Sequence, residues 1–236
     1  MMAGKLFLIP SYLSASNDAG FIAPMVVEVL RNTSYYLTEN VRTSRRFISS
    51  LKAGIVIENL HFDTLDKSTS WDDLYPLFEP VRMGEDMGVI SEAGLPCLAD
   101  PGNIAVSFAH QNHIQVVPMP GASSIQTALI ASGFNGQQFT FHGYLPIDKK
   151  LRRQKIKELE GLSKTGFTQL FMETPYRNMQ LFDDLKQICL PTTYLSIAAN
   201  ISGADEFIQT NSIEKWKKQK INLQKIPAIF SLGILA

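Results

Sequence analysis

The chain has 236 residues, enough for one large domain or for two domains of about 115 residues each. Its 45% apolar and 19% charged residues are typical of a globular protein, and 22 basic and 22 acidic residues give a formal net charge of zero. This balance argues against a protein that holds nucleic acid by bulk positive charge, so any contact with nucleic acid must be local.

The N-terminal stretch MMAGKLFLIPS holds an apolar segment that is too short for a secretory signal or a membrane span. Cys97 and Cys189 are far apart in the sequence and follow no metal-ligand spacing, which indicates two free thiols in a reducing compartment. We therefore expect a cytoplasmic protein.

The first half of the chain alternates short apolar runs with segments of helical periodicity. The apolar runs predict strands over Lys5–Ser11, Tyr35–Thr38, Met87–Ile90 and Gln115–Met119. The periodic segments predict helices over Phe21–Arg31, Val41–Leu51, Trp71–Phe78 and Ile104–His110. Asn59–Ser70 is polar and is expected to be a loop.

The segment Pro118–Gly121 has two prolines and a glycine, which forbid a continuous helix or a central strand. It predicts a border between an N-terminal domain, residues 1–118, and a C-terminal domain, residues 119–236. Beyond it, strands are predicted over Phe139–Tyr144, Thr168–Met172, Tyr194–Ala198, Glu206–Thr210 and Pro227–Leu235. Helices are predicted over Ser123–Ser132, Lys149–Leu162, Tyr176–Ile188 and Ile213–Gln219. The alternation indicates an α/β protein with mostly parallel sheets, the second of them mixed.

Several familiar motifs are absent. The 15 glycines form no G-x-G pair, which removes the dinucleotide fingerprint, and no P-loop, H-E-x-x-H, C-x-x-C or G-x-S-x-G is present. His110 and His113 share a helix face but have no carboxylate or cysteine nearby, so we expect solvated side chains rather than a metal site. An enzyme of this composition either needs no metal or nucleophile of its own or uses a cofactor that supplies the reactivity.

Four loops follow predicted strands, the place where α/β sheets bind ligands. They are Pro10-Ser11, Ser91–Gly102, Pro118–Ser124 and Phe171–Arg177. The second, SEAGLPCLADPG, has glycines and prolines that fix a bent path with exposed backbone amides and carbonyls. In the third, the free amides of a helix start suit a carboxylate.

These loops resemble those of the tetrapyrrole methylase superfamily of S-adenosylmethionine (SAM) methyltransferases. The most similar branch methylates a ribose 2′-hydroxyl in small-subunit ribosomal RNA. That branch has V-S-D-A-G-T-P-L-I-S-D-P-G, E-D-T-R-x-T-R, V-P-x-P-G-x-S-A, F-x-G-[FY]-L-P and E-S-P-H-R. The corresponding segments here are Val89–Gly102, Glu39–Arg45, Val117–Ser124, Phe141–Pro146 and Glu173–Arg177.

The resemblance implies two α/β domains with SAM in the interdomain cleft, usually in a homodimer. Superfamily positions that touch SAM correspond to Pro10, Ala93, Gly94, Leu95, Leu98, Ser123, Ser124, Met172, Ala199, Asn200 and Pro227. Methyl transfer from a sulfonium is an in-line displacement with a good leaving group. The protein must therefore mainly orient the acceptor and exclude water.

Two basic clusters stand out in this neutral chain. Arg42, Arg45 and Arg46 form the first, and the second lies within Lys149–Lys157; both are candidate phosphate contacts. Glu39 is the candidate for orienting or deprotonating an acceptor hydroxyl. Arg177 is a further candidate substrate contact, although it could equally form a structural ion pair with Glu173.

Three functions stay open. The first is an RNA ribose 2′-O-methyltransferase acting on ribosomal RNA or the small ribosomal subunit, which the basic clusters and the segment E-N-V-R-T-S-R favour. The second is a methylase of a small corrinoid-like macrocycle, which would share the fold. The third is a protein that binds SAM or RNA without catalysis. It is suggested by Pro10–Ser14, which replaces the family's P-x-G-N-L, and by Ala198–Asp205, which replaces R-E-L-T-K-x-H-E.

Overall fold

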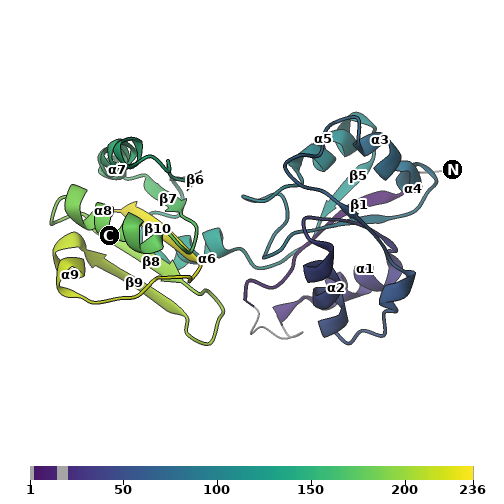
Figure 1. Ribbon diagram of the computed structural model, residues 1–236, viewed down its shortest axis with the longest axis horizontal. Coiled ribbons are helices and arrows are strands. Elements are labelled where there is room, and N and C mark those ends of the chain that lie inside the picture. The colour runs from purple at the N-terminus through teal and green to yellow at the C-terminus, as the bar shows by residue number, and fades with distance from the viewer. Residues whose placement is uncertain (1–2, 15–20, 236) are drawn as a thin grey trace. The chain divides into compact units, whose positions relative to one another are not determined.

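The computed structural model describes residues 3–14 and 21–235 (Figure 1). By its internal contacts the chain divides into two units, Met1–Ser123 and Ser124–Ala236. The border falls at the end of the proline- and glycine-containing segment that follows the first sheet; a domain border at residue 118 stays a prediction. None of the described helices is long and apolar enough to cross a membrane.

The first unit is built on a five-stranded sheet in which every pair of neighbours is parallel. The strand order is β3-β2-β4-β1-β5. The strands are β1 (Lys5–Ile9), β2 (Tyr35–Thr38), β3 (His61–Thr64), β4 (Met87–Ile90) and β5 (Gln115–Pro118). The central strand β4 is buried at all four positions, which explains its uninterrupted apolar run.

Helices cover both faces of this sheet (Figure 1). On one face, α1 (Pro24–Asn32) and α2 (Val41–Ser50) pack against Ile9, Tyr36 and Ile90. On the other, α3 (Leu74–Leu77), α4 (Glu79–Arg82) and α5 (Asn103–Gln111) pack against Leu6, Leu37 and Val89. The two sets of side chains alternate along the strands because successive residues point to opposite faces of a sheet.

Two predictions for this unit are wrong in detail. The expected loop Asn59–Ser70 contains β3, which pairs with β2 from Tyr35 opposite His61 to Thr38 opposite Thr64. As an edge strand β3 is largely exposed, so it lacks the apolar run used to recognise strands. The expected helix Trp71–Phe78 begins later, at Leu74, and is followed by a second short helix that starts after Phe78.

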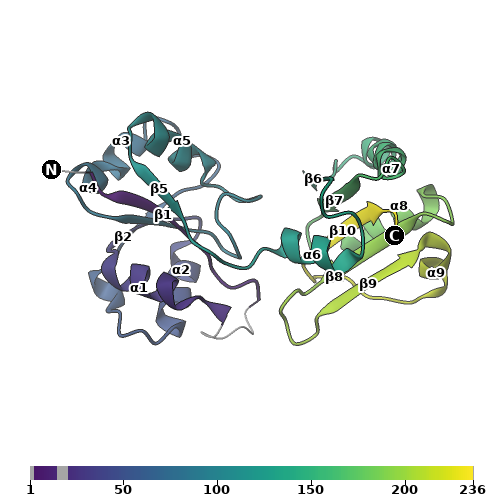
Figure 2. The same ribbon diagram turned by 180° about the vertical axis from the view of Figure 1, so that it is seen from behind.

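The second unit has a mixed sheet, as the sequence predicted. Its five strands have the order β6-β7-β10-β8-β9. Only β6 and β7 are parallel neighbours; the other three pairs are antiparallel. The strands are β6 (Phe139–Tyr144), β7 (Thr168–Met172), β8 (Tyr194–Ala199), β9 (Phe207–Ser212) and β10 (Ala228–Gly233). On one face, α7 (Lys149–Ser163), α8 (Asn178–Ile188) and α9 (Ile213–Lys218) enclose one apolar core. Helix α6 (Ser124–Ser132) contacts β8, β9 and β10 (Figure 2).

Strand direction decides which loops meet. In the first unit all strands run the same way, so the loops that follow them gather at one edge of the sheet, the carboxyl edge of the first unit. In the second unit β10 is antiparallel to both β7 and β8, so β6, β7 and β8 share one direction. Their carboxyl ends lie beside the amino ends of β9 and β10 at the carboxyl edge of the second unit.

Candidate functional site

The loops after β1 and β4 are tied together at the carboxyl edge of the first unit. The backbone N–H of Ser11 donates to the carbonyl of Gly94 at 2.9 Å, and the N–H of Gly94 donates to the carbonyl of Tyr12 at 3.3 Å. The Ser11 hydroxyl donates to the carbonyl of Ser91 at 3.1 Å. These bonds fix the first turn of the Ser91–Gly102 loop against the end of β1.

The Ser91–Gly102 loop takes a backbone path that few residues adopt. Gly94 and Gly102 have φ of 74° and 132°, and the non-glycine residues Cys97 and Ala99 have φ of 68° and 69°. A Cβ on Gly94 would lie 2.8 Å from the Leu13 side chain and 3.1 Å from the Ala122 carbonyl. A side chain at Gly94 would therefore be strained by the torsion angle, and the Leu13 side chain would have to move to make room for it.

The loop after β5 approaches the same point. A Cβ on Gly121 would lie 2.2 Å from Cβ of Pro10 and 2.5 Å from its Cγ, so only glycine fits there. The structure therefore brings together the six cofactor candidates that lie in these three loops of the first unit. Three are buried (Pro10, Gly94 and Ser123), Leu95 is half-buried, and Ala93 and Leu98 are exposed. Ser124, the first residue of the second unit, is half-buried.

The four remaining cofactor candidates meet at the carboxyl edge of the second unit. Met172 pairs with Ile229 of β10, and Ala199 pairs with Ala228. The N–H of Asn200 donates to the carbonyl of Pro227 at 2.9 Å. The register of β7, β8 and β10 thus places Met172, Ala199, Asn200 and Pro227 side by side.

Glu39 lies in a cluster of carboxylates. Burial, followed by the charges of Asp100 and Glu92, raises the pKa of Glu39, while the charge of Lys67 opposes the rise. Burial also raises the pKa of Asp100, although a hydrogen bond with Ser91 lowers it in part. The charge of Asp66 also raises the pKa of Glu39. Sequence reasoning missed the roles of Asp66 and Asp100; Asp66 follows β3, an edge strand without an apolar run.

Three arginines project from α2, immediately after Glu39. The Asn40 side chain caps the helix by accepting from the N–H of Thr43 at 3.2 Å, the role that asparagine and aspartate fill equally well. Arg42, Arg45 and Arg46 are exposed. Arg45 lies 5.9 Å above the Phe62 ring, and within residues 3–14 and 21–235 none of the three forms an ion pair.

Arg177 has a partner in its own unit. Its Nη2 atom contacts Oε1 of Glu173 at 2.6 Å, and the Glu173 side chain is only 1% exposed. The structural ion pair considered for these two residues is therefore present. A substrate contact by Arg177, whose side chain is 29% exposed, stays a prediction.

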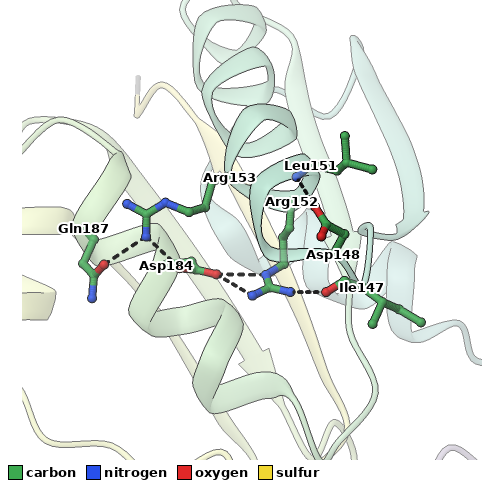
Figure 3. A network of polar contacts seen from close by, with 7 residues as sticks. All are labelled: Ile147, Asp148, Leu151, Arg152, Arg153, Asp184 and Gln187. Carbon is green, nitrogen blue, oxygen red and sulfur yellow. Dashed lines mark hydrogen bonds and ion pairs between the residues drawn. The ribbon is translucent and has the colours of Figure 1, made fainter.

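The basic segment of α7 contains both buried and exposed cations, and Figure 3 shows the contacts of Arg152 and Arg153. Arg152 is 1% exposed; its Nε and Nη2 donate to Oδ2 of Asp184 at 2.9 Å and 2.7 Å, and its Nη1 donates to the carbonyl of Ile147 at 2.8 Å. The prediction that Arg152, in the basic segment Lys149–Lys157, contacts phosphate is wrong, because its guanidinium is buried and bound to Asp184 and Ile147. Arg153 also binds Asp184, at 3.1 Å, and Gln187 at 3.0 Å.

His110 and His113 are exposed, as expected for solvated side chains, and Cys97 and Cys189 are free cysteines. No group of three or more histidine, cysteine, aspartate or glutamate residues suited to a metal ion occurs in the part of the chain that the structure describes.

Comparison with known sequences decides the family. The model of the family described as Tetrapyrrole (Corrin/Porphyrin) Methylases matches residues 27–216. The chain belongs to the tetrapyrrole methylase family. Two curated relatives are called ribosomal RNA small subunit methyltransferase I. The one from Haemophilus influenzae is 31% identical over 92% of this chain and 73% of its own length. The one from Buchnera aphidicola subsp. Schizaphis graminum is 27% identical over 92% of this chain and 73% of its own length.

Solved structures share the fold of this methylase. Diphthine synthase superposes with a TM-score of 0.65 at 15% identity, covering 96% of this chain and 88% of that chain. Uroporphyrin-III-C-methyltransferase from Thermus thermophilus gives a TM-score of 0.58 at 16% identity, covering 98% and 94%. Enzymes of this family use SAM as the methyl donor, and the chain is a SAM-dependent methyltransferase.

The residues at the carboxyl edge of the first unit fit such a cofactor. SAM presents an adenine, a ribose and an amino-acid end, which need backbone donors and acceptors together with apolar surface. The glycine-restricted path of the Ser91–Gly102 loop leaves Ala93 exposed and Leu95 half-exposed, and Leu98 is 38% exposed. The methylase thus offers backbone polar groups beside apolar side chains, without a metal-binding cluster in its described residues.

Proposed function

We propose that this methylase transfers the methyl group of SAM to the RNA of the small ribosomal subunit, with a ribose 2′-hydroxyl as the acceptor. One observation carries the proposal: three exposed arginines, with no ion pair among the described residues, lie on the helix that follows Glu39, at the edge of the first sheet where the cofactor candidates of the first unit gather. A small anionic macrocycle would not need a row of cations along a helix, whereas an RNA backbone would. The names of the relatives point to the same substrate.

The residues proposed to bind the cofactor lie at the carboxyl edges of the two units. In the first unit they are Pro10, Ala93, Gly94, Leu95, Leu98 and Ser123, and in the second they are Ser124, Met172, Ala199, Asn200 and Pro227. When bound, SAM supplies an electrophilic methyl group on a sulfonium. The chain's own tasks are then to bind the cofactor, to hold the acceptor hydroxyl in line and to keep water out.

Glu39 is proposed to accept the proton of the acceptor hydroxyl. Its carboxylate is made more basic than that of an ordinary glutamate by burial and by the charges of Asp100 and Glu92, which raise its pKa. A more basic carboxylate is a better proton acceptor, provided that it stays ionised at the working pH. Arg42, Arg45, Arg46 and Arg177 are proposed to contact the RNA.

We also propose that the protein works as a homodimer in the cytoplasm, where ribosomal subunits are assembled. The support is the family resemblance for the dimer and the proposed substrate for the compartment. Sedimentation equilibrium at micromolar concentration tests the dimer: a mass of one chain would contradict it.

The decisive experiment uses small ribosomal subunits from a strain that lacks this protein. Incubation with methyl-labelled SAM should label the small-subunit RNA. The phosphodiester next to the labelled ribose should resist alkaline hydrolysis, because a 2′-O-methylated ribose has no free 2′-hydroxyl to cleave it. Label that appears on a base, or no label in any RNA while SAM binds normally in calorimetry, would rule out the proposal.

Two variants connect this activity to the site. Gly94→Trp should abolish SAM binding and labelling, because even a Cβ at this position meets Leu13 at 2.8 Å. Glu39→Gln should leave SAM binding intact but lower kcat by about 100-fold or more, the usual contribution of a positioned base. Full activity of Glu39→Gln would rule out the proposed role of Glu39 as proton acceptor, while the proposal for the substrate would stand.

A further inference from the structure

Three lysines on α7 form no ion pair in the described part of the chain, a property they share with Lys215, Lys217 and Lys220 on and after α9. Lys149, Lys150 and Lys157, here called the α7 lysine face, are exposed. Elsewhere in the second unit, Lys155 contacts Glu158, Lys186 contacts Asp183 and Lys218 contacts Glu214, each within one helical turn. None of the three lysines of the face forms an ion pair within the described ranges 3–14 and 21–235.

The sequence around the face explains this lack of partners. The residues one turn after Lys149 and Lys150 are Arg152, Arg153 and Gln154, none of which is acidic. Glu160 follows Lys157 by one turn, but it is buried and accepts from the N–H of Leu190 at 2.7 Å. Asp148 is the one carboxylate beside the face, and its Oδ1 is used in capping the helix through the N–H of Leu151.

The orientation of α7 is fixed by its buried side. The bonds from Arg152 and Arg153 to Asp184 bind α7 to α8, as Figure 3 shows. At about 100° per residue, Lys150 and Lys157 lie roughly 140–160° around the helix from Arg152. They therefore lie on a different side of α7 from buried Arg152. The face lines a hollow of about 600 Å³ together with Asp148, Arg153 and Gln154.

The face begins next to the site. Helix α7 follows the carboxyl end of β6, and this end shares the edge where Met172 and Asn200 lie. Lys149 and Lys150 stand in the first turn of the helix, close to that edge. Lys157 is about 10 Å further along the axis, at 1.5 Å per residue.

We propose that the α7 lysine face binds the phosphate backbone of the substrate RNA. The inference rests on the proposed function and adds a second RNA contact, in a different unit from the α2 arginines. Lysine ammonium groups on flexible stems act as point charges that meet phosphate without reading bases. The contact is therefore independent of the RNA sequence, and it contributes to substrate affinity rather than to the methyl transfer step.

The test compares two triple variants that remove the same charge. One is Lys149→Ala/Lys150→Ala/Lys157→Ala; its matched control is Lys215→Ala/Lys217→Ala/Lys220→Ala, three exposed lysines on and after α9. Binding of a small-subunit RNA fragment is measured between 50 and 200 mM salt. For the α7 variant we expect the Kd to rise about tenfold and the slope of log K against log salt to flatten by about 2, at about 0.7 per phosphate contact.

A second readout separates binding from a general structural effect. With ribosomal subunits, the KM of the α7 variant should rise while kcat at saturation and the affinity for SAM stay unchanged. Unchanged RNA affinity and salt slope, or equal losses in the α9 control, would overturn the inference. So would a loss of binding to vesicles containing phosphatidylglycerol with RNA binding intact, because the face would then serve a membrane. Failure of the proposed function would look different, since the unaltered protein would methylate no small-subunit RNA.

Discussion

Gly121 stands where the loop after β5 touches Pro10 at the end of β1. Gly121→Ala would place a Cβ 2.2 Å from Cβ of Pro10, so one of the two loops must move. We expect a loss of about 1–3 kcal/mol in the free energy of unfolding, as for other forced overpacking, and weaker SAM binding. Urea unfolding and calorimetry measure the two effects.

Gly136→Ala is the matched control, because a Cβ at Gly136 has no neighbour within 4 Å. This variant should unfold and bind SAM as the unaltered protein does. If Gly121→Ala behaved in the same way, the close approach of Gly121 to Pro10 would not matter for the site.

Asp100 carries a charge that the folded state disfavours. Burial raises its pKa, so folding is opposed by this carboxylate above the folded-state pKa and is no longer opposed below the ordinary carboxyl pKa. Asp100→Asn should therefore raise the Tm at pH 7 by about 1–3 °C. The gain should shrink as the pH falls and disappear near pH 3. Thermal scans across this range measure it, and a lower Tm at pH 7 would contradict the assignment.

At the level of helices, the Arg152–Asp184 pair fastens α7 to α8. Asp184→Ala would leave the guanidinium of Arg152, 1% exposed, without its anion, and removal of one partner of a buried pair costs about 3–5 kcal/mol. Lys155→Ala breaks a more exposed pair with Glu158 and should cost less than about 1 kcal/mol. Urea unfolding compares the two variants; equal losses would show that burial of the Arg152 pair is not decisive.

The same pair shows why the sequence could not predict which basic residues are exposed. Arg152 and Lys150 occur in the same charged segment, and Asp184, the partner of Arg152, lies 32 residues away in α8. Only packing separates the buried cation from the exposed ones. Local patterns succeeded where the signal is local: the predicted strands Tyr35–Thr38 and Met87–Ile90 and the glycine-restricted loop after the second of them match the structure.

Strand order limited the prediction of the site. The order β3-β2-β4 places the loops after β3 and β4 on either side of the loop after β2, which brings Asp66 and Asp100 near Glu39. A sequence read segment by segment contains no strand order, and β3 was missed because it is a polar edge strand. The raised pKa of Glu39 was therefore beyond sequence reasoning, although Glu39 itself was singled out.

For the whole molecule the formal net charge is zero, so RNA affinity depends on local clusters of basic residues rather than on the total charge. Arg45→Ala should weaken RNA binding severalfold and flatten the slope of log K against log salt by about 0.7. Lys52→Ala, which removes the same charge just beyond the end of α2, is the control and should change neither. Filter binding at several salt concentrations measures both. An unchanged slope for Arg45→Ala would show that Arg45 is a solvated side chain without a phosphate contact.

The position of β1 in its sheet also governs how the chain can fold while it is being synthesised. Strand β1 pairs with β4 and β5, so it has no neighbouring strand until about 80 further residues have left the ribosome. At about 5–20 residues per second this delay lasts roughly 4–16 s. During that interval Leu6–Ile9 is an unpaired apolar strand and a natural target for a chaperone that binds nascent chains. The β8–β9 pair of the second unit forms from residues close together in sequence and has no comparable delay.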